Sequence, residues 1–146
     1  MTTLLFLTTS TLASNPRLVK EIEALKNENN CTAIYFKQND WSYKLTKQII
    51  ERNPDVRFIC IDRKAKPGLT IVSKLIHKLA ILLNSMFRND LAIAAYASND
   101  KTFQLHQTVK SQCKTNHFSS IIAHNLGAFY PALKANKIDI NLQLDI

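Results

Sequence analysis

The stretch TLLFLTTSTLASNPRLVKEIEALKNENNCTAIYF, at residues 3–36, contains two short apolar runs separated by one amphipathic segment. The runs at residues 3–8 and 31–36 have the composition of buried strands. Between them, Asn15 and Pro16 fit the N-cap and the first position of a helix. A strand, a helix and a second strand in this order predict a right-handed crossover between two parallel strands.

The same alternation continues along the rest of the chain. Asp40 can cap a second helix, whose inner face we expect to be Trp41, Leu45 and Ile49. The other expected elements are a strand at 56–61, helices at 70–87, 91–97 and 103–113, a strand at 119–123, a helix at 126–135 and a strand at 138–146. This order predicts a single α/β domain over residues 1–146, with a three-layer, Rossmann-like open parallel sheet and helices on both faces.

Composition excludes several kinds of site. The 146 residues include only two glycines, Gly68 and Gly127, so the glycine-rich loops that cradle phosphates and the G-x-S-x-G nucleophile turn are absent. The three cysteines have no C-x-x-C spacing, which argues against a cysteine zinc site and a disulfide framework. Cys31 and Cys60 lie in apolar runs, so we expect buried, reduced thiols and a cytoplasmic protein.

The net charge and the N-terminal sequence indicate which ligands, nucleic acids or membranes the chain could contact. A net charge of +8 favours phosphate-bearing ligands or an anionic membrane surface. Because the lysines and arginines are spread along the whole chain without a basic block, a generally basic, solvated surface explains the charge equally well. Nucleic-acid binding would show a steep salt dependence, but no motif of interleaved aromatic and basic residues supports it, so no nucleic-acid partner is expected. The apolar core at residues 4–7 is short and no positive charge precedes it, which argues against a secretory signal. No run of 18 apolar residues predicts a membrane span.

The helix expected at 70–87 has two interpretations. Its apolar stripe can pack against the sheet like the inner face of any crossover helix. It can also lie on the inner face of a membrane, because cationic side chains flank it. The stripe consists of Ile71, Leu75, Leu79, Leu82, Leu83 and Met86, and the flanking cations are Lys66, Lys74, Lys78 and Arg88.

A ligand site is expected where the strand order reverses, beyond the carboxyl ends of residues 3–8 and 119–123. His124 follows the second of these strands and can serve as an acid or base, bind a phosphate or hydroxyl, or be a structural histidine. Asp62 ends another strand and can meet a ribose or cap a turn. His77, His106 and His117 share no ligand spacing, so no metal site is expected.

Three segments carry a resemblance: SNPRLVKEIEALK at 14–26, IIAHNLGAFYPA at 121–132 and LQLDI at 142–146. Taken in order, they resemble the N-terminal domain of bacterial GT-B glycosyltransferases of the retaining, family 4 type. That resemblance implies an enzyme that moves a sugar from a nucleotide-sugar to a glycan or lipid-linked acceptor, without a further cofactor. A donor-binding C-terminal domain would lie outside this chain, and the isolated N-terminal domain would have little or no activity.

The resemblance also assigns residues to the cleft. It implies that His124, as a catalytic residue, and Asn125 lie near the transferred sugar. It places Ser10, Asn15 and Arg17 in the loop that borders the cleft, and it places Asp145 near the cleft at the end of the last strand. Many relatives have a Gly-Gly loop after the first strand, whereas this chain has TTSTLASN at 8–15, which puts a close backbone approach to phosphate in doubt.

A flavodoxin-like binding or signalling module without catalysis of its own is the alternative. A phosphoacceptor module of this kind needs an acidic cluster after the first strand, where this chain has threonines and a serine at 8–11. Asp62 stands at a suitable strand end. Binding of flavin or of an acyl phosphate would favour this alternative.

Overall fold

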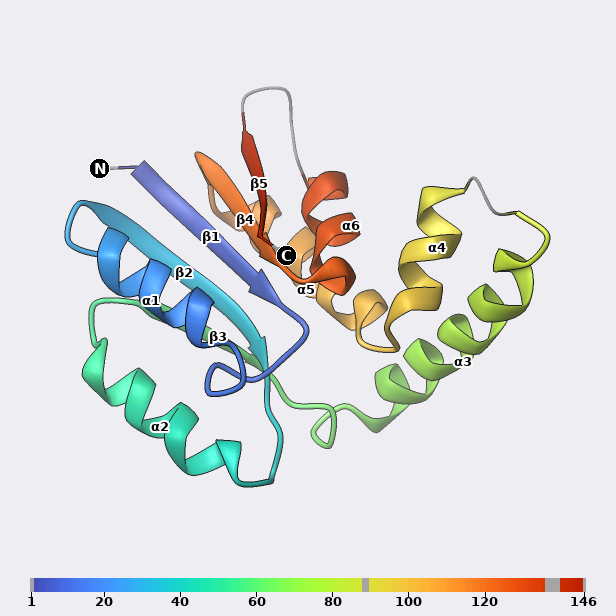
Figure 1. Ribbon diagram of the computed structural model, residues 1–146, viewed down its shortest axis with the longest axis horizontal. Coiled ribbons are helices and arrows are strands. Elements are labelled where there is room, and N and C mark those ends of the chain that lie inside the picture. The colour runs from blue at the N-terminus through green and yellow to red at the C-terminus, as the bar shows by residue number, and fades with distance from the viewer. Residues whose placement is uncertain (1, 88–89, 136–139, 146) are drawn as a thin grey trace.

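The computed structural model describes residues 2–87, 90–135 and 140–145. Five strands form one sheet in the order β3-β2-β1-β4-β5, and every neighbouring pair is parallel (Figure 1). The strands are β1 (Thr2–Thr8), β2 (Asn29–Phe36), β3 (Arg57–Ile61), β4 (Ser120–His124) and β5 (Asn141–Asp145). The helices are α1 (Pro16–Leu25), α2 (Ser42–Arg52), α3 (Pro67–Asn84), α4 (Leu91–Ser98), α5 (Thr102–Thr115) and α6 (Leu126–Ala135). The predicted three-layer α/β fold is therefore confirmed.

The central strand β1 is buried on both faces, which explains its nearly continuous apolar sequence. Leu4 and Phe6 belong to the core under α1, which contributes Leu18 and Ile22. Leu5 and Leu7 face the opposite core, where Leu105 and Val109 of α5 and Ala128 and Ala132 of α6 cover the sheet. Alternate side chains of β1 thus pack against the helices on the two faces of the sheet.

The inner face of α2 differs from the prediction. Trp41 is 68% exposed and Leu45 is 46% exposed, whereas Ser42 and Thr46 are buried. The polar residues point inward because they bond to loops: Ala13 N donates to Thr46 Oγ1, and Ser42 Oγ donates to Asp40. Trp41 and Leu45 were therefore wrongly expected on the inner face, whereas the third expected residue, Ile49, does pack against the core under α1.

The apolar stripe of α3 does not pack against the sheet, so the more ordinary of its two interpretations was wrong. The helix lies at the outer edge of the molecule, where its main neighbours are α4 and α5 (Figure 1). Its buried residues are Ser73 and Ala80, while Leu82 and Met86 are 69% and 74% exposed. Arg88, expected to flank the stripe, lies outside the described residues.

Two further expectations need adjustment. Cys31 is buried, and its burial raises the pKa of the thiol, but Cys60 is exposed although it lies in an apolar run. The last strand is described over Asn141–Asp145, so Ile138, Asp139 and Ile146 of the expected strand lie outside the described residues. In the described part of the chain, no helix combines the length and the apolar character that crossing a membrane requires.

The two glycines of the sequence make a matched pair for testing the packing. A Cβ on Gly127 would lie 2.9 Å from Thr9 Cγ2 and 3.1 Å from Asn99 Cβ, whereas a Cβ on Gly68 meets no atom within 4 Å. Gly127→Ala should lower the free energy of unfolding by about 1–3 kcal/mol, since α6 must move away from the loop after β1 and from the turn after α4. Gly68→Ala should leave it unchanged or raise it by up to about 1 kcal/mol, because alanine favours the helix.

Urea unfolding followed by circular dichroism measures both changes. Equal stability of the two variants would contradict the close approach of α6 to the loop after β1.

Candidate functional site

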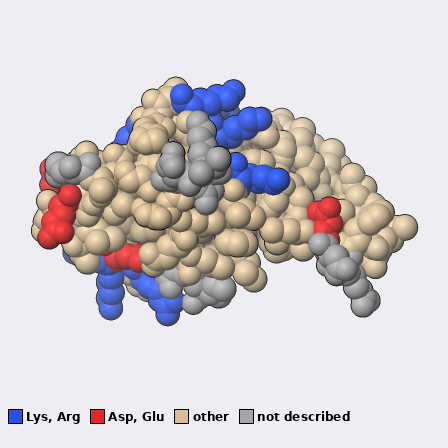
Figure 2. Space-filling model, turned by 90° about the horizontal axis from the view of Figure 1, so that it is seen from above, with Lys and Arg blue, Asp and Glu red and all other residues tan. Residues whose placement is uncertain are grey.

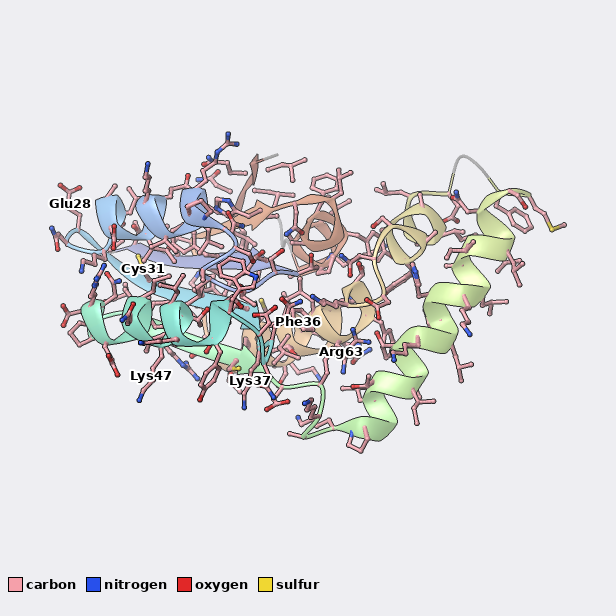
Figure 3. The ribbon with its side chains drawn as sticks, turned by 60° about the horizontal axis from the view of Figure 1, so that its bottom comes forward. Glu28, Cys31, Phe36, Lys37, Lys47 and Arg63 are labelled. Carbon is pink, nitrogen blue, oxygen red and sulfur yellow. The ribbon has the colours of Figure 1, made fainter. Side chains whose placement is uncertain are left out.

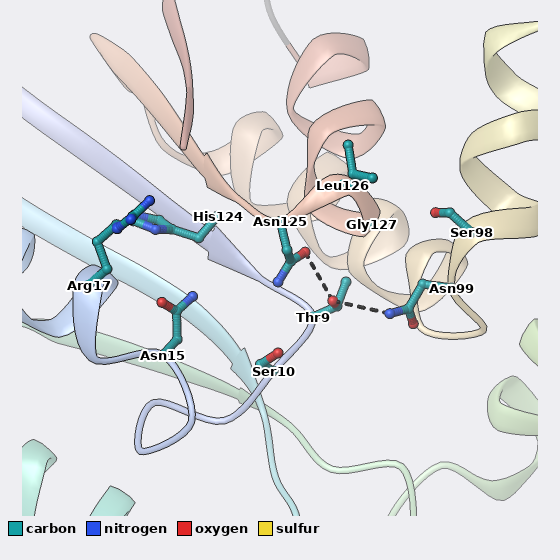
Figure 4. Close-up of a pocket in the computed structure, with 10 residues that line it drawn as sticks. All are labelled: Thr9, Ser10, Asn15, Arg17, Ser98, Asn99, His124, Asn125, Leu126 and Gly127. Carbon is teal, nitrogen blue, oxygen red and sulfur yellow. Dashed lines mark hydrogen bonds between the residues drawn. The ribbon is translucent and has the colours of Figure 1, made fainter. Parts of the chain in front are cut away.

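A crevice of about 600 Å³ opens beyond the carboxyl ends of β1 and β4, where the strand order reverses (Figure 4). Its volume lies in the range of small-molecule sites. The structure brings five of the six predicted site residues to its wall: Ser10, Asn15, Arg17, His124 and Asn125. The remaining wall consists of Thr9, Ser98, Asn99, Leu126 and Gly127.

The hydroxyl of Thr8 joins the two central strands at the base of the crevice. It accepts hydrogen bonds from Asn125 Nδ2 at 3.0 Å, from Ser10 N at 3.1 Å and from Asn15 Nδ2 at 3.4 Å. The Thr8 side chain is fully buried, so these bonds satisfy an oxygen that has no access to water. The end of β1 is thereby tied to the loop that follows it and to the end of β4.

Asn125 makes the turn from β4 into α6. Its φ of 84° lies in the left-handed region, which asparagine tolerates better than most residues. The side-chain oxygen accepts from Thr9 Oγ1 at 3.0 Å and from Ala128 N at 3.2 Å, so it also caps the first turn of α6. The same amide therefore sets the direction of α6 and positions the crevice wall.

The junction between α4 and α5 supplies a part of the site that the sequence analysis missed. Asn99 Nδ2 donates to Thr9 Oγ1 at 3.3 Å, and Lys101 Nζ donates to the Thr9 carbonyl at 3.0 Å. Lys101 also lies over the ring of Phe36, and burial lowers the pKa of its amine. The segment SNDK at 98–101 has the composition of a helix-connecting turn, and nothing in the sequence indicates that it reaches β1.

Asn15 and Arg17 come from the start of α1. Asn15 is the predicted N-cap, since its Oδ1 accepts from Leu18 N at 3.3 Å. Arg17 lies in the first turn and lines the crevice (Figure 4). The positive ends of α1 and α6 and the Arg17 guanidinium all favour negative charge in the crevice.

His124 is held firmly in place. Its side chain is 2% exposed, its Nε2 donates to Glu21 Oε2 at 2.8 Å, and its ring stacks near Phe6. The second oxygen of Glu21 accepts from Gln143 Nε2 at 3.4 Å, so the carboxylate links α1 to both β4 and β5. This geometry suits a positioning residue, and the catalytic role of His124 stays a prediction.

Asp145, the sixth predicted site residue, pairs in register with His124 across β4 and β5. Its backbone thus lies at the same edge of the sheet as the crevice. Only its backbone position is described, so its expected approach to the cleft stays a prediction.

Asp62 does not join this crevice. It lies at the end of β3, two strands from β1, and forms an ion pair with Lys37 Nζ at 2.9 Å. Hydrogen bonds from Lys37 and from the backbone of Lys64 hold the pKa of its carboxyl below the usual value. Asp62 therefore serves the turn into α3, as one of its two interpretations proposed.

The remaining histidines are not grouped. His77 Nδ1 contacts the Tyr96 carbonyl at 2.8 Å, and His106 Nδ1 contacts the Tyr96 hydroxyl at 2.7 Å. These two residues thus join α3 and α5 to α4, while His117 is exposed. Burial, with Lys110 and Lys134 nearby, lowers the pKa of His106. Among the described residues, no three His, Cys, Asp or Glu side chains are placed to hold a metal ion.

The crevice wall has the chemistry of a binding surface. Three asparagine amides and three hydroxyl groups line it together with the Arg17 guanidinium, and its described lining residues include no carboxylate. Amides and hydroxyls both donate and accept hydrogen bonds, so they suit a ligand rich in hydroxyl groups.

No protein-family model, no curated protein and no solved structure matches this chain.

The Asn125 turn can be tested with two substitutions. Asn125→Gly keeps the positive φ but removes three side-chain hydrogen bonds, so it should lower the free energy of unfolding by about 1–3 kcal/mol. Asn125→Ala should lose a further ~1 kcal/mol, because alanine is strained in the left-handed region. Urea unfolding measures the difference, and an alanine variant as stable as the glycine variant would contradict the strained turn.

Proposed function

We propose that the crevice binds the sugar of a nucleotide-sugar or glycan ligand, and that this domain forms the acceptor-side wall of a retaining glycosyltransferase. The full enzyme would move a sugar from a nucleotide-sugar to a glycan or lipid-linked acceptor. The observation that carries the proposal is the crevice lining at the reversal of strand order, which combines amides and hydroxyls with the guanidinium of Arg17. The GT-B resemblance of residues 14–26, 121–132 and 142–146 supports the same assignment.

The residues that line the crevice offer two kinds of contact to a nucleotide-sugar. The amides of Asn99 and Asn125 and the hydroxyl of Ser10 can exchange hydrogen bonds with sugar hydroxyls. Arg17 offers a charge-assisted contact for a phosphate, which the positive ends of α1 and α6 reinforce. A nucleotide-sugar presents both groups, whereas a neutral glycan presents only hydroxyls.

The described lining residues support binding and electrostatic stabilisation more directly than proton transfer. They include no carboxylate, and the His124 Nε2 atom is engaged with Glu21. In retaining transfer, the charge that develops on the sugar and on the leaving phosphate needs stabilisation by positioned groups. We therefore assign Arg17 and the crevice amides to positioning, with His124 fixing the end of β4. A cytoplasmic location, where nucleotide-sugars are the donors, is part of the proposal.

Isothermal titration of the chain with UDP-glucose, GDP-mannose, a neutral disaccharide and flavin mononucleotide tests this assignment. At least one sugar-containing ligand should bind. Arg17→Gln should weaken nucleotide-sugar binding by about tenfold or more, since a charge-assisted hydrogen bond is lost, and should change the affinity of a neutral glycan little. Arg52→Gln makes the same change in charge at the far end of α2 and serves as the control.

Binding of flavin mononucleotide without binding of any sugar ligand would favour the flavodoxin-like alternative. Equal weakening by Arg17→Gln and Arg52→Gln would show that the crevice is not the site.

A further inference from the structure

The helix α3 is turned the opposite way from an ordinary surface helix. Its inner side makes three polar contacts beside the buried Ala80: Ser73 Oγ donates to the Asp100 carbonyl at 2.5 Å, His77 contacts the Tyr96 carbonyl, and Thr70 Oγ1 accepts from Gln104 at 3.0 Å. Just before the helix, Arg63 and Asp100 form an ion pair at 2.8 Å. Polar contacts therefore anchor α3 to α4 and α5, a role that apolar contacts normally have.

The outer side of α3 is apolar. Side chains at helical spacing project away from α4 (Figure 3), and each is about half exposed or more. A contiguous exposed patch of this kind marks an interaction surface, since water-facing helices normally carry polar residues there. The patch, which we call the α3 outer face, consists of Ile71, Leu75, Leu79, Leu82 and Met86.

The charges around the α3 outer face are positive. Lys74 and Lys78 are exposed on adjacent turns beside it, and α3 contains no acidic residue. Asp90, the exposed carboxylate that follows, caps α4 by accepting from Ile93 N. On the face seen from above, the end of the molecule formed by α3 and α4 shows one acidic patch on a mostly uncharged surface (Figure 2).

We propose that the α3 outer face docks on a membrane that contains anionic lipids, with the helix parallel to the surface. An apolar stripe flanked by lysines is the pattern of helices that lie in the lipid interface, where the apolar side chains enter the boundary and the lysines meet the headgroups. The 18 residues of α3 span about 27 Å, enough for a continuous contact with the surface. This inference does not rest on sugar binding in the crevice.

A second copy of the chain fits the same face less well. In a twofold-symmetric pair the same patch contacts itself, so Lys74 and Lys78 of the two copies would approach one another. Bringing like charges together opposes such a pair, whereas an anionic bilayer attracts the same lysines.

Co-sedimentation with vesicles tests the proposal. The chain should bind vesicles of equal parts phosphatidylglycerol and phosphatidylcholine, and bind pure phosphatidylcholine at least about tenfold less. Lys74→Glu with Lys78→Glu should weaken binding to the anionic vesicles by at least about tenfold. Lys44→Glu with Lys114→Glu changes the net charge equally on α2 and α5 and should have a much smaller effect.

Leu75→Gln with Leu82→Gln removes apolar contact without altering charge, and it should also weaken binding. Both side chains are exposed, so circular dichroism should show an unchanged fold. Equal vesicle binding by the two lysine pairs would overturn the proposal, as would no binding by the original chain. A dimer in solution that Leu75→Gln with Leu82→Gln dissociates would assign the face to a second copy instead.

A tryptophan probe locates the contact independently of affinity. Trp41 is the only tryptophan, so Trp41→Phe removes all tryptophan fluorescence. Adding Leu79→Trp to this variant gives a single fluorescent tryptophan on the α3 outer face. Its emission should shift to shorter wavelength on adding anionic vesicles. Lys47→Trp on α2 is the control and should not shift. A shift only at the α2 probe would place the membrane contact elsewhere.

Discussion

The buried hydroxyl of Thr8 is the interaction on which the candidate site depends. It accepts hydrogen bonds from the loop after β1, from the cap of α1 and from Asn125 at the end of β4. Where the strand order reverses, the loops after β1 and β4 lead to helices on opposite faces of the sheet, so a crevice opens between the strand ends. The Thr8 contacts fix the width of that crevice, and the left-handed Asn125 then directs α6 away from it.

Much of the fold could be predicted because the signals are local. The apolar runs of the strands, the Asn15–Pro16 helix start and the alternation of strand and helix all lie within short windows of sequence. The strand pattern also placed His124 at the edge of the sheet where the strand order reverses. The glycosyltransferase resemblance added Ser10, Asn15, Arg17 and Asn125, and the structure brings all five to one crevice because the carboxyl ends of β1 and β4 lie together.

The parts that sequence reasoning missed depend on contacts between distant segments. Asn99 and Lys101 reach Thr9 across about ninety residues, and no local pattern indicates that approach. The predicted inner face of α3 and the first half of that of α2 were wrong for a related reason. Hydrophobic periodicity assumes that apolar side chains face inward, but Thr46 and Ser73 face inward because loops and neighbouring helices supply their hydrogen-bond partners. A polar residue with a buried partner therefore overrides the apolar pattern.

Two surfaces of the domain thus carry distinct chemistry: a polar crevice at the sheet edge and an apolar, cation-flanked helix at the outer end of the molecule. Side-chain amide resonances report on whether the crevice holds a sugar-containing ligand. In a 1H–15N spectrum titrated with a nucleotide-sugar, the Asn99 and Asn125 side-chain amides should shift together with the Ser10 backbone amide. Shifts confined to the separate cavity beside Tyr35, Tyr43 and Cys60 would show that the ligand does not bind in the crevice.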